Sequence, residues 1–359
     1  PRPHHTQALE ALFDTSLENL GFTRPRSSPP PATFNDQRLH QPPADTAPPL
    51  RFSGPLDQGI LDSYRDLTAA YRQLFGPLPG SALESTVTEH ARLGSRLLTS
   101  PSTEHHRALA GQVCDAWLLS ARIRLFDTID LSVARAHLHQ ALAAAQTAED
   151  DARAAAVLAH SALAIALTPT ATDGPEPHEI IRIARTFAAR CTENVPQLMA
   201  WLDTAEADIE LRTGDPAAAA PLVAHAEQLC KTGTEPKWLD WLHPHQVATL
   251  KADVLLSLER DAEAVSVVQR IVHGATNPKH RALAYADLAA IAAAQGNPEL
   301  ACDHLHDALD ALDGAWHESV ETRIRQVRNQ LEPWSNDPGL QAVDERLYTW
   351  ATALEVASR

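Results

Sequence analysis

Cysteine and glycine are scarce in this chain of 359 residues. The four cysteines lie far apart with no CxxC pair, so the sequence offers neither a zinc knuckle nor a small disulfide framework. Each cysteine falls in a mostly apolar setting, which predicts buried free thiols in a reducing cytoplasm. With only 14 glycines and abundant alanine and leucine, the composition favours helix throughout.

Long apolar runs and the motifs of enzymes are also missing. No run of 18 apolar residues occurs, so we expect no membrane span. We find no nucleophile elbow, no phosphate loop, no HExxH and no pair of carboxylates set apart from the general acidic surface. Histidines two residues apart point to nearly opposite sides of a helix and cannot easily share a metal ion. The sequence therefore predicts no enzyme, no cofactor and no metal site.

The formal net charge of −16 is unevenly placed. Residues 1–55 carry five arginines and five acidic residues, so the excess negative charge lies in residues 56–359. A body of this sign repels phosphate and is not expected to hold DNA by itself. The simpler interpretation of the charge is that it keeps the protein soluble.

Composition divides the chain into three parts. Residues 1–23 contain a helix with an apolar face that is too short to fold alone. Residues 24–55 include nine prolines and little that could pack, which is typical of an extended linker. From residue 56 to 359 helices follow one another, and no alternating stretch calls for a strand. These helices are expected at 56–75, 81–99, 103–126, 131–148, 150–167, 177–191, 196–213, 216–231, 243–259, 261–273, 278–295, 298–312, 317–331 and 338–356.

A repeated helix pair accounts for this order. Its clearest copy consists of Tyr285, Leu288, Ala289 and Ala292, the turn Gly296-Asn297-Pro298, and then Ala301, Leu305 and Ala308. Small residues let two antiparallel helices approach closely, and the leucines fill the space between them. A second copy surrounds Gly214-Asp215-Pro216, and an upstream copy has Ile129 where the turn glycine is expected. The pattern resembles the tetratricopeptide (TPR) repeat. It predicts an all-α fold, a TPR-like α-solenoid of antiparallel helix pairs, with an unrelated Ala-rich bundle as the alternative.

Polar stripes on two helices form the candidate binding site. The first stripe is Trp201, Thr204, Asp208 and Arg212, and the second is Gln246, Thr249, Asp253 and Ser257. Spacings of three and four place each set on one helix face. Stacked pairs leave a concave groove lined by the first helix of each pair. We therefore expect a polar patch that binds a peptide backbone or a polar ligand, the alternative being a solvated groove face. Trp238 and Trp241 could anchor a partner or cap the gap between repeats.

The first residues resemble the end of a DNA-binding domain. Leu12-Phe13, Ser16 and Leu20-Gly21-Phe22, after Arg2-Pro3, are similar to the last helix and exit of XRE-type helix-turn-helix regulators. The segment Leu67-Thr68-x2-Tyr71-Arg72-x-Leu74 is similar to the first sensor helix of that family. The resemblance is sharpest at 9–22 and 278–312. It implies that 1–23 is the C-terminal remnant of a helix-turn-helix domain and that 56–359 is a helical-repeat sensor domain.

The resemblance also implies a function. The chain would be the ligand- or peptide-sensing and dimerisation region of a cytoplasmic, DNA-binding transcriptional regulator. Its partners would be a peptide, small-molecule or protein effector and a second copy of itself in a homodimer. DNA would be bound only through a part that precedes Pro1, an expectation that fits Met199 being the only methionine. The alternative is a TPR adaptor that joins proteins and has no small-molecule effector.

Overall fold

The computed structural model describes residues 56–99, 105–168, 176–191, 195–232, 238–312 and 317–357. The expectations for 1–23 and 24–55 concern residues outside these ranges. Within the described ranges every regular element is helical and no strand occurs. None of the helices in these ranges is long and apolar enough to cross a membrane.

Fourteen α-helices make up the described part of the chain. They are α2 (Gln58–Phe75), α3 (Gly80–Leu97), α4 (His106–Phe126), α5 (Leu131–Thr147), α6 (Asp151–Ala166), α7 (Pro177–Ala188), α8 (Pro196–Thr213), α9 (Pro216–Thr232), α10 (Pro244–Ser257), α11 (Asp261–Gly274), α12 (Pro278–Ala294), α13 (Pro298–Ala311), α14 (Glu318–Gln330) and α15 (Pro338–Ala357), with a short 3-10 helix at Glu332–Trp334. All fourteen are confirmed predictions, and each end lies within three residues of the expected one. Seven of them begin at a proline, where the missing amide would have had no helical acceptor.

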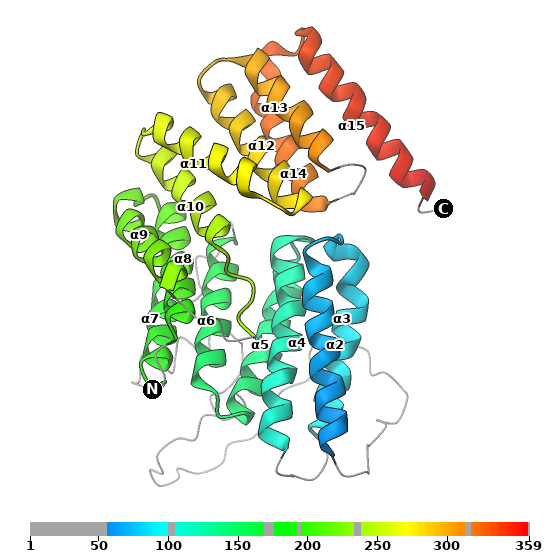
Figure 1. The fold of residues 1–359 in the computed structure, drawn as a ribbon, viewed down its shortest axis with the longest axis vertical. Helices are drawn as coiled ribbons and strands as arrows, with labels where there is room; N and C mark the ends of the chain where they lie inside the picture. The colour runs from blue at the N-terminus through cyan, green and yellow to red at the C-terminus, as the bar shows by residue number, and fades with distance from the viewer. Residues whose placement is uncertain are drawn as a thin grey trace, which may run out of the picture.

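Neighbouring helices pack in pairs, and the pairs stack into a curved array (Figure 1). The pairs α4 and α5, α6 and α7, α8 and α9, α10 and α11, and α12 and α13 are in close contact. The first helices of successive pairs also meet, as α4 does with α6, α6 with α8, and α12 with α14. The all-α helical-repeat solenoid expected from the sequence is confirmed.

Small side chains allow this close packing. Ala289, Ala301 and Ala308 are fully buried and belong to one core cluster with Leu305. The alanines place only methyl groups between the two backbones, so α12 and α13 lie close together. Gly94 of α3 has the same role in the first helices, because a Cβ atom there would overlap the Tyr64 hydroxyl of α2.

The tight turns share one backbone geometry. One residue in each of five turns has a left-handed φ, namely Ile129 (51°), Glu149 (55°), Gly214 (88°), Glu259 (58°) and Gly296 (72°). In four of these turns the next residue, Asp130, Asp150, Asp215 or Asn297, caps the following helix by accepting a hydrogen bond from the amide three positions later. The upstream repeat copy therefore forms the same turn with isoleucine in place of glycine.

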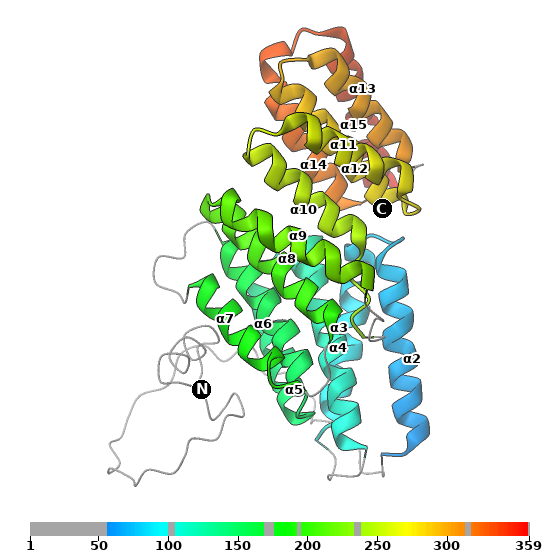
Figure 2. The same ribbon diagram turned by 60° about the vertical axis from the view of Figure 1, so that its left-hand side comes forward.

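The curvature brings the C-terminal helices over the ends of the N-terminal ones. In Figures 1 and 2, α12 and α14 lie above the upper ends of α2 and α4. Lys279 in the first turn of α12 donates a hydrogen bond of 2.8 Å to Asp127 Oδ1 at the end of α4. Its ammonium also lies 5.3 Å from the centre of the Phe75 ring of α2. These contacts join the first helices of the described array to α12, and the concave side becomes partly enclosed.

Candidate ligand-binding cavity

A cavity of about 880 Å³ lies on the concave side, between the N-terminal and C-terminal helices. Most of its wall is formed by residues of α2, α4, α6, α8, α10, α12 and α14, with the connection 240–243, Ile271 of α11 and a few turn residues. From α4 onward the main contributors are the first helices of successive pairs, the arrangement expected from the repeat. The volume falls within the range of sites that enclose a drug-sized ligand.

Six of the seven predicted site residues line this cavity. They are Trp201, Thr204, Asp208, Gln246, Thr249 and Asp253. Arg212 does not line it, because it lies one turn further along α8, where its exposed side chain pairs with Asp208 at 3.1 Å. Ser257, at the exposed end of α10, likewise lies outside the cavity wall. The stripes therefore come together as expected, and their role in binding stays a prediction.

Asp253 is the carboxylate of the predicted patch that has no hydrogen-bonding or ion-pairing partner. In the described part of the chain its carboxylate makes no hydrogen bond or ion pair, whereas the neighbouring Asp287 accepts a hydrogen bond of 2.8 Å from Arg323. Burial, followed by the charge of Asp287, raises the pKa of Asp253 to about 7. The group can therefore change its protonation state near neutral pH.

Arg122, four residues before the end of α4, was not among the residues predicted from the sequence. Its side chain lines the cavity, and the residue is only 8% exposed. The guanidinium carbon lies 5.0 Å from the centre of the Trp241 ring and 5.5 Å from that of Phe75. A signal was available in the sequence, since Arg122 falls within the largely apolar stretch 109–125, where a charge is out of place.

No carboxylate neutralises Arg122 by direct contact. Its Nε proton is buried without an acceptor, and no hydrogen bond or ion pair joins it to another described residue. The two carboxylates that act on it electrostatically are already engaged, Asp127 with Lys279 and Asp240 with Arg72. Burial lowers the pKa of Arg122 to about 10, so the side chain stays cationic at neutral pH.

Two tryptophans beside Arg122 carry further unused donors. The Trp201 and Trp241 rings lie edge to face with their centres 6.2 Å apart, and both indole N–H groups are buried without an acceptor. His160 packs against both rings at 4.4 and 5.5 Å. Burial lowers the pKa of His160 to about 3, so this imidazole is neutral. The region around Arg122 therefore holds three donors without an acceptor, beside two buried acceptors without a donor, His160 Nε2 and Asp127 Oδ2.

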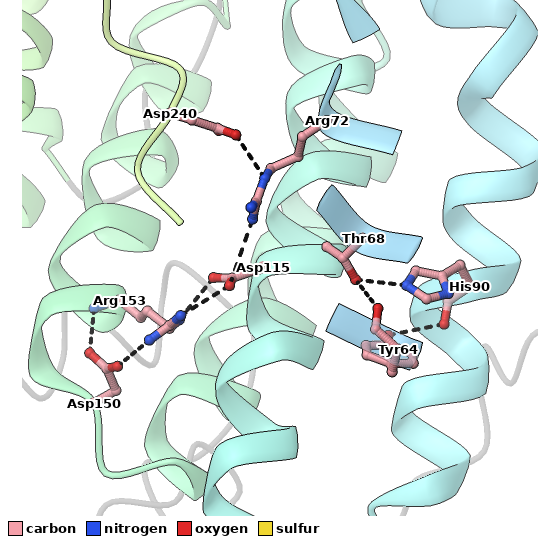
Figure 3. A network of polar contacts seen from close by, with 8 residues as sticks. All are labelled: Tyr64, Thr68, Arg72, His90, Asp115, Asp150, Arg153 and Asp240. Atoms are coloured by element: carbon pink, nitrogen blue, oxygen red, sulfur yellow. Dashed lines mark hydrogen bonds and ion pairs between the residues drawn. The ribbon is translucent and has the colours of Figure 1, made fainter. Parts of the chain in front are cut away.

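A chain of ion pairs holds Trp241 in the cavity wall. Arg72 of α2 joins Asp240 at 2.9 Å and Asp115 of α4 at 3.8 Å, and Asp115 is also bound by Arg153 of α6 at 2.8 Å (Figure 3). The chain fastens the connection that carries Trp241 to three helices of the N-terminal half. The Trp238 ring lies over the Arg153 guanidinium at 4.9 Å. Both tryptophans thus pack within the fold, and only Trp241 lines the cavity.

Three histidines form another part of the wall. The His245 ring lies 5.4 Å from the His243 ring and 4.2 Å from that of His280. Burial lowers the pKa of His245 to about 4 and that of His280 to about 3, so both are neutral near pH 7. Among the described residues no group of three or more His, Cys, Asp or Glu side chains is arranged to hold a metal ion.

The cavity thus combines a cationic, aromatic region around Arg122 with an acidic region around Asp253. Such a site can bind an anionic group at one side and a hydrogen-bond donor at the other. No protein-family model matches this chain, and no curated protein matches it in sequence.

Proposed function

We propose that the chain is the sensing and dimerisation region of a cytoplasmic, DNA-binding transcriptional regulator, and that its effector binds in the cavity. The observation that carries the proposal is a partly enclosed cavity whose wall holds a buried arginine with no carboxylate in contact and an aspartate, Asp253, with no ion pair. Unpaired buried charge lowers stability. Functional sites are where folds most often retain it.

The regulator part of the proposal rests on two resemblances. Residues 1–23 are similar to the end of an XRE-type helix-turn-helix domain, and the helix pairs are similar to TPR repeats. An effector that contacts both α4 and α12 would favour one curvature of the solenoid over others. In a homodimer that change would alter the spacing of two DNA-binding domains. The gene tests this part, because the proposal fails if no helix-turn-helix is encoded upstream of Pro1.

The effector part is tested by thermal-shift measurements with fractionated extract of the cells that carry the gene. We expect a fraction of low molecular mass to raise the melting temperature of the protein. The double variant Asp208→Ala, Asp253→Ala should lose most of that shift while it still unfolds cooperatively. Ser257→Ala is the control, because Ser257 lies on α10 like Asp253 but outside the cavity. This variant should keep the full shift in melting temperature.

The same measurement separates the sensor from the adaptor. A protein adaptor would be stabilised by a fraction of high molecular mass and by no small molecule. The effector site is rejected if only a fraction of high molecular mass raises the melting temperature, and if it does so equally for the wild type and the double variant. In that case the function as a protein-binding TPR adaptor is favoured.

A further inference from the structure

We infer that Arg122 holds the single carboxylate of an amphipathic ligand, whose apolar part lies against Phe75, Trp201 and Trp241. The inference rests on the proposed function and narrows it to a class of effector. It names a subsite around Arg122 that shares only Trp201 with the polar stripes on α8 and α10.

The first step is that Arg122 needs an anion that the described residues do not supply. Arg153 provides the comparison, because it also lies over an indole ring, that of Trp238, and still binds Asp115 and Asp150. Arg122 likewise contacts aromatic rings, those of Phe75 and Trp241, but no carboxylate binds it. When the flat face of a guanidinium stacks on an aromatic ring, the N–H groups at its edge stay free to bind a carboxylate through two parallel hydrogen bonds.

The second step concerns the indole donors. The N–H groups of Trp201 and Trp241 are buried without an acceptor, as is the Nε–H of Arg122. Buried donors are nearly always satisfied in folded proteins, by protein groups, water or ligand. A carboxylate accepts several hydrogen bonds and donates none, so it suits the unpaired guanidinium of Arg122 in the cavity wall. A cationic group would be repelled there.

The other residues of the cavity wall indicate the chemistry of the rest of the ligand. Next to Arg122 the wall is apolar and aromatic, with Phe126, Leu163 and Leu242. An apolar group gains free energy when it is buried there. The other cations of the wall are already paired, Arg72 with Asp240, Lys279 with Asp127 and Arg323 with Asp287. The described wall therefore offers no second unpaired cation, so the ligand has one anionic group. Its source is a small organic acid or the C-terminus of a peptide.

The test uses two probes of nearly equal size, 1-naphthoate and its neutral analogue 1-naphthamide. Calorimetric titration of the whole chain should show tighter binding of naphthoate. Arg122→Gln should weaken naphthoate binding by about tenfold to a hundredfold, the loss expected for hydrogen bonds to a charged group. The same variant should leave naphthamide binding unchanged. Arg270→Gln removes the same charge from an exposed position of α11 outside the cavity, and both probes should bind it as they bind the wild type.

Arg122 is buried, so its variants are checked for cooperative unfolding. Arg122→Lys keeps the charge but loses the planar fork, and should bind naphthoate with an affinity between those of the wild type and Arg122→Gln. The inference is overturned if the wild type binds neither probe, or binds both equally. It is also overturned if Arg270→Gln weakens naphthoate as much as Arg122→Gln does.

A second pair of probes identifies the source of the carboxylate. The tripeptide Ala-Ala-Phe is compared with its C-terminal amide on the wild type and on Arg122→Gln. If the free acid binds through Arg122, the subsite takes peptide C-termini. If only naphthoate does, it takes small organic acids. The two proposals can fail separately. If Arg122→Gln does not weaken naphthoate binding but an extract fraction stabilises the protein, the subsite is rejected and the proposed function is kept. If naphthoate binds through Arg122 but no extract fraction stabilises the protein, the subsite is kept and the proposed function is rejected.

Discussion

Ile129 occupies a backbone conformation that ordinarily belongs to glycine. Its φ is 51°, and the corresponding residues of two later turns are Gly214 and Gly296. A β-branched side chain in this region costs about 1–2 kcal/mol. The residue is 55% exposed, so burial of the side chain offsets little of that cost.

Replacing Ile129 by glycine should therefore stabilise the protein. We expect the free energy of unfolding to rise by about 1 kcal/mol, because relief of strain exceeds the entropy that glycine adds to the unfolded chain. Gly214→Ala should lower it by about 1 kcal/mol for the same reason. Gly274→Ala is the control, since this glycine has no left-handed φ and open space around it, and should instead raise the free energy of unfolding by about 0.5 kcal/mol. Urea titrations measure all three, and a loss of stability in Ile129→Gly would contradict the strain argument.

Asp253 should make stability depend on pH. Its pKa is about 7 in the folded protein and near 3.8 when unperturbed, so the folded state binds the proton more tightly. Stability due to this group is present below about pH 4 and is lost as the pH rises through about 7. Asp253→Asn removes this loss of stability, because the amide does not ionise. Its melting temperature should exceed that of the wild type at about pH 8 and approach it near pH 4. A variant that melts below the wild type at the higher pH would contradict the assignment.

At the scale of the helix, local signals determined nearly everything that could be predicted. Prolines in first turns, Asp and Asn caps, and a glycine after α8 and near the end of α12 placed the fourteen helices in the sequence. The stripes on α8 and α10 were predictable because spacings of three and four fix a helix face whatever the tertiary structure. The same local geometry explains why a turn without glycine at Ile129 was still placed correctly.

The contacts between distant helices were not predictable in this way. Lys279 and Asp127 are separated by 152 residues, and their meeting depends on the summed rotation of all the helix pairs between them. A small error in each rotation would place them far apart. Arg122 escaped prediction for a related reason, because its neighbours Phe75 and Trp241 come from α2 and from the connection before α10.

The link between α4 and α12 should contribute strongly to stability. The side chains of Lys279 and Asp127 are only 10% and 4% exposed. Lys279→Met leaves a buried carboxylate without its cation, and should lower the free energy of unfolding by about 3 kcal/mol. The double variant Lys279→Met, Asp127→Leu should recover most of this loss, because no unpaired charge remains. Chemical denaturation of the four proteins of the cycle measures the coupling, and additive losses would show that the pair is not linked.

At the scale of the whole molecule, closure of the solenoid creates the cavity. Residues from α2 and α4 form one side of it, and residues from α10, α12 and α14 form the other. A ligand between them contacts helices of the N-terminal and C-terminal parts at once. It would therefore stabilise the closed curvature more than any open one, which is the physical basis for a sensor built from stacked helix pairs.

Hydrogen–deuterium exchange of the whole chain, with and without saturating 1-naphthoate, tests this account most directly. The account predicts slower exchange on both sides of the cavity at once, at the end of α4, in 238–243, in α10 and in the first turns of α12. Exchange in α13 and α15, which contribute nothing to the cavity wall, should not change. Protection confined to one half of the chain, or strongest in α13 and α15, would show that the ligand does not bind between the closed ends.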